Sequence, residues 1–212
     1  VWKRLRIPRK YSIEQFFEIL LKEEINYVVL RWFDIFPNIR VGGDIDILVS
    51  DSDLNKLEKL LVRSPIFGGI PCDIYNVSGS PGYNYKYMAY FPPLISSNIL
   101  NNSVLYENYI RVPSPIDHAL SLSYHAIYHK GEDSGIPKDS SSQVDFNLKI
   151  EHDYIDSLST LFEACNCRVD INMESIDLFL NKRGWRPPID MLSKLGINNT
   201  WCASIAKRVL DE

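Results

Sequence analysis

Two aspartates, Asp44 and Asp46, stand two residues apart where an aliphatic run begins, and two glycines, Gly42 and Gly43, precede them. Residues i and i+2 of a β-strand point to the same face of a sheet, so the two carboxylates are expected to converge. Carboxylates that close repel each other unless a cation lies between them, and Mg²⁺ prefers carboxylate ligands together with phosphate oxygens. Because glycine lets a phosphate approach the backbone closely, this stretch predicts a strand that binds a metal ion and a phosphate group.

A third acid, Asp73, begins the next predicted strand and is also followed by an aliphatic residue. If that strand pairs with the strand of Asp44 and Asp46, the three carboxylates lie together. Such a set suits two-metal phosphoryl transfer, in which the ions hold a triphosphate and lower the pKa of an attacking hydroxyl, and the third carboxylate acts as a base. Without that pairing, Asp44 and Asp46 are only acids that cap a turn before a strand.

The stretch YVVLRWFDIFPNIRVGGDIDILVSDSDLNKLEKLL, residues 27–61, resembles the polymerase-β-type nucleotidyltransferases, and among them a bacterial nucleotidyltransferase-like branch. In that branch an aliphatic strand leads through a yP…R…gDiDlLV segment into a helix. The matching residues are Phe36, Pro37, Arg40, Gly43, Asp44, Asp46 and Val49. The segment VPSPIDHALSLSYHAIYHK is similar to the family's following helix, so the resemblance extends over about residues 12–130.

This resemblance implies an enzyme that uses Mg²⁺ or Mn²⁺ and a nucleoside triphosphate. It transfers a nucleotidyl group to a hydroxyl of a small molecule, a sugar or a protein. The resemblance also implies the roles of the three acids: Asp44 and Asp46 are catalytic metal ligands, and Asp73 is the third carboxylate of the catalytic and metal site.

One feature departs from the family pattern. These transferases carry a glycine after the first strand that cradles the triphosphate, whereas Arg31 and Trp32 occupy that place here. Arg31 and Arg40 can contact phosphate through charge-assisted hydrogen bonds. Gly42 and Gly43 can allow the close backbone approach that the missing glycine would have provided. The departure leaves open whether a nucleotide binds as in the family.

A second group of candidate residues lies on a strongly predicted helix, residues 114–130. His125 and His129 are four residues apart and therefore share a helix face. They either pack inside the protein or form a second shell that contacts the acceptor. Lys130 begins a polar segment that is either a phosphate-binding or acceptor-binding loop or a flexible connector.

The periodicity of the first half predicts an α+β fold, with a small mixed sheet and flanking helices. Ser12 and Gln15 form a capping box at the start of the first helix. Either Asp51 or Ser52 is expected to cap the second helix. The predicted order is a helix over 11–24, a strand over 25–33, a loop over 34–40, a strand over 44–50, a helix over 51–64 and a strand over 68–79.

The pattern changes beyond this core. Residues 78–112 are predicted to be irregular, with Tyr83, Tyr85 and Tyr87 alternating on one face of a strand, where they can stack on a base or a sugar. Helical patterns then recur near 153–165, 173–182, 187–194 and 199–210. We therefore expect a nucleotidyltransferase-like core over 1–112 and a helical region over 113–212 that packs on it.

Composition narrows the possible partners. The net charge of −4 argues against long nucleic acid as a partner, and the basic segment over 1–10 is expected to be solvated. The four scattered cysteines suit reduced thiols, and no apolar run is long enough to span a membrane, so a cytoplasmic location is expected. The chain starts with Val1 rather than methionine, which is compatible with a piece of a longer chain.

Two other functions compete with the nucleotidyltransferase. A glycosyltransferase can use an Asp-x-Asp motif to hold Mn²⁺ and the diphosphate of a nucleotide sugar, although that motif usually follows a longer nucleotide-binding βαβ stretch than this chain has. A non-catalytic nucleotidyltransferase-like module of a larger protein is the other alternative, and the missing glycine after the first strand favours it.

Overall fold

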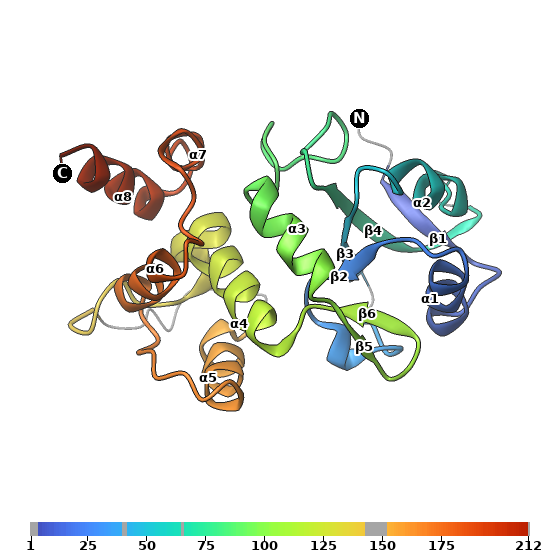
Figure 1. Cartoon of the computed structure of the whole chain (residues 1–212), viewed down its shortest axis with the longest axis horizontal. Helices are drawn as coiled ribbons and strands as arrows, with labels where there is room; N and C mark the ends of the chain where they lie inside the picture. Colours follow the sequence, from blue (N-terminus) through green and yellow to red (C-terminus); the bar gives the residue numbers. More distant parts are fainter. Residues whose placement is uncertain (1–3, 40–41, 65, 143–151, 212) are drawn as a thin grey trace. The chain divides into compact units, whose positions relative to one another are not determined.

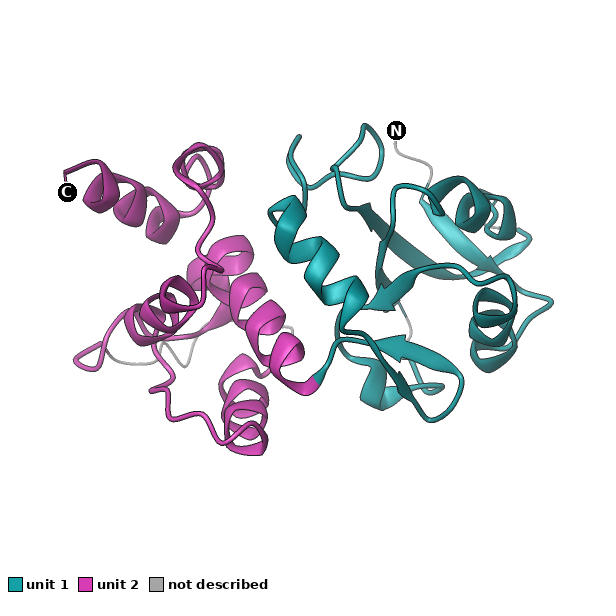
Figure 2. Cartoon of the chain, viewed as in Figure 1, with its two compact units in different colours: residues 1–114 teal, residues 115–212 magenta. Residues whose placement is uncertain are grey.

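The computed structural model of the chain describes residues 4–39, 42–64, 66–142 and 152–211. The chain divides into two compact units, residues 1–114 and 115–212, which Figure 2 colours separately. The first unit is a small mixed sheet with flanking helices and the second is helical, which confirms the predicted α+β class. The predicted packing of the helical half on the core stays a prediction.

The first unit is built on a four-stranded sheet in the order β1-β4-β3-β2 (Figure 1). Strands β3 and β4 are parallel and are joined through α2, whereas β1 and β2 pair antiparallel with β4 and β3. A hairpin, β5–β6, forms a separate two-stranded sheet. The elements are β1 (Leu5–Pro8), α1 (Ile13–Lys22), β2 (Tyr27–Val29), η1 (Phe33–Ile35), β3 (Ile45–Val49), α2 (Leu54–Leu60), β4 (Gly68–Asn76), α3 (Pro93–Asn101), β5 (Val104–Tyr106) and β6 (Ile110–Val112).

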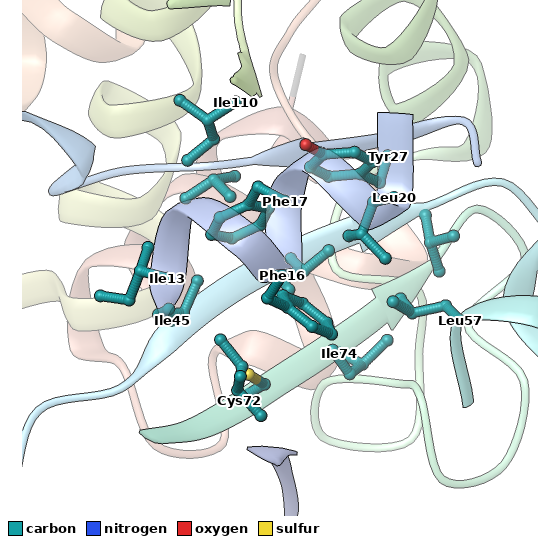
Figure 3. Close-up of a cluster of buried hydrophobic side chains, with 14 of the residues drawn as sticks. Ile13, Phe16, Phe17, Leu20, Tyr27, Ile45, Leu57, Cys72, Ile74 and Ile110 are labelled. Carbon is teal, nitrogen blue, oxygen red and sulfur yellow. The ribbon is translucent and has the colours of Figure 1, made fainter. Parts of the chain in front are cut away.

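One face of the sheet packs on helix α1. The helix begins with the predicted capping box, in which Ser12 and Gln15 each bond the other's backbone N–H. Its buried residues Phe16, Phe17 and Leu20 point toward the strands (Figure 3). Alternate strand residues meet them there: Tyr27, Val29, Ile45, Ile47, Val49, Cys72 and Ile74. This core holds β3 and β4 in place, so the intervening residues of both strands must face the other way.

The opposite face of the sheet is covered in part by α3, which Figure 1 shows on the side away from α1 and α2. Residues Val28 and Leu48 of the strands are fully buried on this face, as are Ile95 and Ile99 of α3 at or below 4% exposure. Asp46 and Asp73 belong to this same face by strand alternation. The acids therefore lie at the edge of an apolar layer rather than in open solvent.

Several predictions about the first unit were wrong. The basic N-terminal segment contains strand β1, in which Leu5 and Ile7 are buried. Residues 78–112 contain α3 and the β5–β6 hairpin, and Pro93 stands in the first turn of α3, a common place for proline. Strand β2 is shorter than predicted because Trp32, with φ of 57°, turns the chain out of the strand direction.

The predicted caps of α2 were also wrong. Asp53 is the N-cap residue, and its side chain makes no capping hydrogen bond. Asp51 instead accepts hydrogen bonds from Asn76 and from the backbone of Ser78, and Asp53 accepts one from the backbone of Asn26. These carboxylates tie the helix entrance to neighbouring loops, which competes with capping.

The second unit follows the predicted helical pattern. Its elements are α4 (Pro115–Tyr124), a π-helix η2 (His125–Lys130), η3 (Gly131–Ser134), α5 (Tyr154–Ala164), α6 (Met173–Lys182), α7 (Ile189–Leu195) and α8 (Thr200–Asp211). The buried Asp177 on α6 accepts hydrogen bonds from Tyr128 of η2, at 2.7 Å, and from the half-buried Arg186. Across the described ranges, no helix is both long and apolar enough to cross a bilayer.

Candidate functional site

The sheet brings the predicted acids together. In the parallel pair β3–β4, Asp46 is the direct register partner of Asp73, with Ile45 opposite Cys72 and Ile47 opposite Ile74. The aliphatic neighbours are drawn into the α1 core, so the two carboxylates project from the same face. The predicted pairing of the two strands is confirmed. It depends on the α2 crossover, because parallel strands need such a connection.

Asp46 is buried and forms an ion pair. Its Oδ1 lies 2.8 Å from Nη2 of Arg31, and the two side chains are each 9% exposed. Nη1 of Arg31 donates to the Tyr90 hydroxyl at 2.9 Å. Burial raises the pKa of Tyr90, so this hydroxyl stays protonated. Arg31 therefore orients the Asp46 carboxylate, and its contact with phosphate stays a prediction.

Arg4 binds the other two acids at once. Its Nε and Nη2 donate to the two carboxylate oxygens of Asp73 at 2.6 and 2.7 Å, and Nη2 also contacts Oδ2 of Asp44. The hydrogen bond to Asp73 is the main cause of the raised pKa of Arg4. All three side chains are between 36% and 38% exposed, so water reaches this group. Strand β1 positions Arg4, because Leu5 pairs with Cys72 beside Asp73.

Sequence reasoning missed Arg4 as a site residue. The basic segment is predicted to be a solvated terminus, although residues 4–7, RLRI, alternate basic and apolar residues as an edge strand does. That alternation was the available signal. No local sequence pattern could predict that Arg4 binds Asp73, because Asp73 lies 69 residues further along the chain.

The carboxylates of Asp44, Asp46 and Asp73 are the candidate ligands for a divalent metal ion. Within the described ranges, no three His, Cys, Asp or Glu side chains are arranged to hold a metal ion. However, Asp44 and Asp73 already share one cation, the guanidinium of Arg4. Both are hard oxygen donors that converge on a point reached by solvent, which is what Mg²⁺ or Mn²⁺ requires. The two carboxylates are thus of the donor type that a divalent ion takes, and replacement of the guanidinium by such an ion stays a prediction.

The glycines before β3 have different roles. Gly42 has φ of 86°, a conformation that side chains rarely adopt, and a Cβ atom there would meet no neighbour within 4 Å. Glycine is therefore needed at this position for the backbone angle rather than for space. Gly43 follows directly before Asp44, and Arg40 lies outside the described residues. The phosphate-binding roles of these three residues stay predictions.

A cavity of about 1010 Å³ opens beside Asp73. Tyr83, Tyr85 and Tyr87 line it, but not from one face of a strand as predicted. Tyr85 and Met88 instead close a two-residue turn by exchanging backbone hydrogen bonds of 2.8 and 3.0 Å. The alternation of tyrosines was a misleading signal, because the chain reverses direction within it.

His125, His129 and Lys130 belong to the second unit. The imidazoles lie edge to face with centroids 5.6 Å apart, each residue is 6% exposed, and Nε2 of His125 is 3.1 Å from the Tyr154 hydroxyl. The shared helix face is therefore confirmed and is packed inside this unit. Lys130 is the last residue of η2. The roles of these residues in phosphate or acceptor binding stay predictions.

The cysteines are all free thiols. Cys72, on β4, is buried in the core against α1, and burial raises the pKa of its thiol to about 12, so the thiol is protonated at neutral pH. Comparison with protein-family models, with curated proteins and with solved structures gave no match of any kind. The case for a function therefore rests on the chemistry of the site.

Proposed function

We propose that the first unit is a metal-dependent nucleotidyltransferase. The observation that carries the proposal is the cation site formed by Asp44 and Asp73 next to Asp46. These carboxylates come from two adjacent parallel strands and already hold a positive group between them. The acceptor of the nucleotidyl group is a hydroxyl. The Asp-x-Asp spacing and the third acid agree with the resemblance to the polymerase-β-type transferases.

Each carboxylate has a distinct task in this reaction. Asp44 and Asp73, which already share the Arg4 guanidinium, would hold the metal together with Asp46, whose carboxylate Arg31 orients. A bound divalent ion supplies charge neutralisation for the triphosphate. The acceptor oxygen forms a bond to the α-phosphorus, and the bond from that phosphorus to the pyrophosphate oxygen breaks. Asp73 takes the hydroxyl proton, because its exposed carboxylate faces the cavity from which an acceptor can enter.

The test is thermal unfolding with each nucleoside triphosphate, with and without Mg²⁺ or Mn²⁺. A ligand at a hundred times its dissociation constant stabilises the folded state by about 2.7 kcal/mol. We expect a metal-dependent shift that Asp44→Asn abolishes. Asp46→Asn is a poorer choice, because it would leave the buried Arg31 without its carboxylate.

Asp34→Asn is the matched control, since Asp34 is an exposed acid on η1 of the same unit. It should leave the nucleotide shift unchanged. A shift with a UDP-sugar and Mn²⁺ but with no triphosphate would favour the glycosyltransferase instead. If no nucleotide shifts the melting temperature, the proposal is wrong.

A second candidate, a non-catalytic nucleotidyltransferase-like module, is favoured by one observation. Arg4 and Arg31 together neutralise most of the charge of the three acids without any metal. In such a module the ion pairs are structural. Mn²⁺ would then fail to bind even after Arg4 is removed.

A further inference from the structure

The cavity beside Asp73 is lined in part by tyrosine side chains. Four tyrosines line it, Tyr75, Tyr83, Tyr85 and Tyr87, and we call it the tyrosine pocket. Of the three site carboxylates, all within the described residues, only Asp73 contributes to its lining. With a volume of about 1010 Å³ it has the size of a small-molecule site. The pocket thus reaches the site carboxylates through Asp73, the proposed base, and through Arg4, which also lines it.

The rim of the tyrosine pocket is a strained turn. Lys86 and Tyr87 are its two central residues, with φ of 48° and 65°. Turns with positive φ at both positions usually contain Asn and Gly, because a side chain at such angles is strained. Here the strained positions carry a cation and an aromatic ring, and Tyr87 is 92% exposed. Strain of this kind is kept where the side chains have a task, so it points to binding at the rim.

The rest of the pocket is held firmly. Tyr83 hydrogen-bonds Glu58, and Tyr85 packs its ring edge to face on Tyr90 with centroids 5.5 Å apart. Gly79, with φ of 65°, lets the chain pass against Ala89, where any Cβ atom would collide with the backbone. The turn is thereby fixed at its base while the Tyr87 ring stays in solvent. An aromatic ring presented in this way is suited to stacking on a ligand.

We propose that the tyrosine pocket binds the acceptor and that the acceptor is a pyranose sugar; this rests on the proposed transferase function. The apolar C–H face of a pyranose packs on the Tyr87 and Tyr85 rings. Its hydroxyls meet the Asn84 amide and the Tyr83 hydroxyl, and one hydroxyl faces Asp73. That oxygen forms the new bond to the α-phosphorus, pyrophosphate leaves, and the proton passes to Asp73.

A nucleotide base is the weaker occupant. The triphosphate of a nucleotide must reach the metal ligands Asp44 and Asp46, and neither lines the pocket. The acceptor hydroxyl only has to reach Asp73, the proposed proton acceptor, and Asp73 does line the pocket. The four tyrosine rings, each with a hydroxyl, and the Asn84 amide also give many hydrogen-bond partners, as a polyhydroxylated ring requires.

The experiment is saturation-transfer NMR on the whole chain, without metal or triphosphate. The probes are the methyl pyranosides of glucose, galactose, mannose and N-acetylglucosamine, with adenosine and uridine in parallel samples. At least one pyranoside should receive saturation at its ring C–H protons. Tyr87→Ala should weaken its binding about tenfold, whereas Tyr87→Phe should keep it within twofold. Phe67→Ala, which truncates another exposed aromatic ring of the unit, is the control and should also stay within twofold.

Three results would overturn the assignment: no saturation of any pyranoside, saturation that Tyr87→Ala leaves unchanged, or saturation of a nucleoside that Tyr87→Ala removes. The last result would make the pocket a base site. Because the NMR experiment needs no metal ion, its result does not depend on whether the protein is a nucleotidyltransferase. A metal-dependent triphosphate shift without pyranoside binding rejects only the sugar. Pyranoside binding without a triphosphate shift rejects only the transferase and leaves a sugar-binding pocket.

Discussion

Arg4 should compete with the metal ion for the carboxylates of Asp44 and Asp73. A divalent ion about 4 Å from the guanidinium would be repelled by about 2 kcal/mol in bulk water and by about 8 kcal/mol at an effective dielectric constant of about 20. The ion and Arg4 therefore cannot share the site, and Arg4 must withdraw before metal binds. The cost of that withdrawal lowers the measured metal affinity.

The cost follows from the exposure of the pairs. Each partner is more than a third exposed, so each ion pair is screened by water and contributes about 0.2–1 kcal/mol. Two pairs give about 0.4–2 kcal/mol, which corresponds to about a twofold to thirtyfold change in affinity. Arg4→Gln removes the competing charge and should tighten Mn²⁺ binding by a factor in this range.

The assay is titration of the metal-free protein with Mn²⁺, followed by calorimetry or by the electron paramagnetic resonance of free Mn²⁺. Arg6→Gln is the matched control, because Arg6 lies two residues further along, on β1, and donates to the Gly69 carbonyl at 2.9 Å rather than to an acid. Its Mn²⁺ affinity should equal that of the wild type. Unchanged or weaker Mn²⁺ binding by Arg4→Gln would refute the competition. If neither protein binds Mn²⁺, the metal site itself is refuted.

Three further predictions concern stability, each read from urea unfolding. Asp46→Asn should lower the free energy of unfolding by about 3 kcal/mol, because it leaves the buried Arg31 guanidinium without its carboxylate; Asp46→Leu combined with Arg31→Met should recover much of the loss. Lys86→Gly should raise the free energy of unfolding by about 1 kcal/mol, because glycine adopts a φ of 48° without strain. The hydrogen bond from Tyr83 lowers the pKa of Glu58 below its ordinary 4.5. The ionised Glu58 carboxylate therefore stabilises the folded state above about pH 5, and this stabilisation is lost as the pH falls through the pKa of Glu58 in the folded protein. Glu58→Gln should remove that part of the pH dependence.

Each of these predictions has a contradicting outcome. Equal losses in the single and double variants would show that the cavity, not the lone charge, causes the destabilisation. A Lys86→Gly protein less stable than the wild type would show that the lysine stem stabilises the turn more than the backbone strain costs. Identical pH profiles for the wild type and Glu58→Gln would show that the carboxylate gains nothing from its hydrogen bond in the folded state.

Local patterns determined much of the first unit. The Ser12–Gln15 capping box and the apolar stripe behind it predicted α1 because helix signals lie within a few residues of one another. The aliphatic runs predicted β3 and β4. The two-residue period of a strand is sufficient to place Asp44 and Asp46 on one face. The helices α5 to α8 followed from the same kind of signal in the second half.

Only the tertiary structure decided which groups face those acids. Arg4 reaches Asp73 across 69 positions, and Tyr90 meets Arg31 across 59. No local period encodes such contacts, since they exist only once β1 and the segment before α3 have docked on the sheet. Helix α3 was missed for a related reason: Pro, Ser and Asn make up five of its nine residues, so its own helix propensity is weak and burial against β2 and β3 stabilises it.

The spacing of two aspartates thus determined that a cation should bind at the start of β3, because like charges on one strand face need a counter-charge. Which cation lies there in the folded chain was decided by the sheet order. Placing β1 next to β4 brings the Arg4 guanidinium to Asp44 and Asp73, and it gives the third acid a tyrosine-lined cavity at its side. Strand order depends on pairing between distant segments, and the energy of that pairing appears only when the chain is folded.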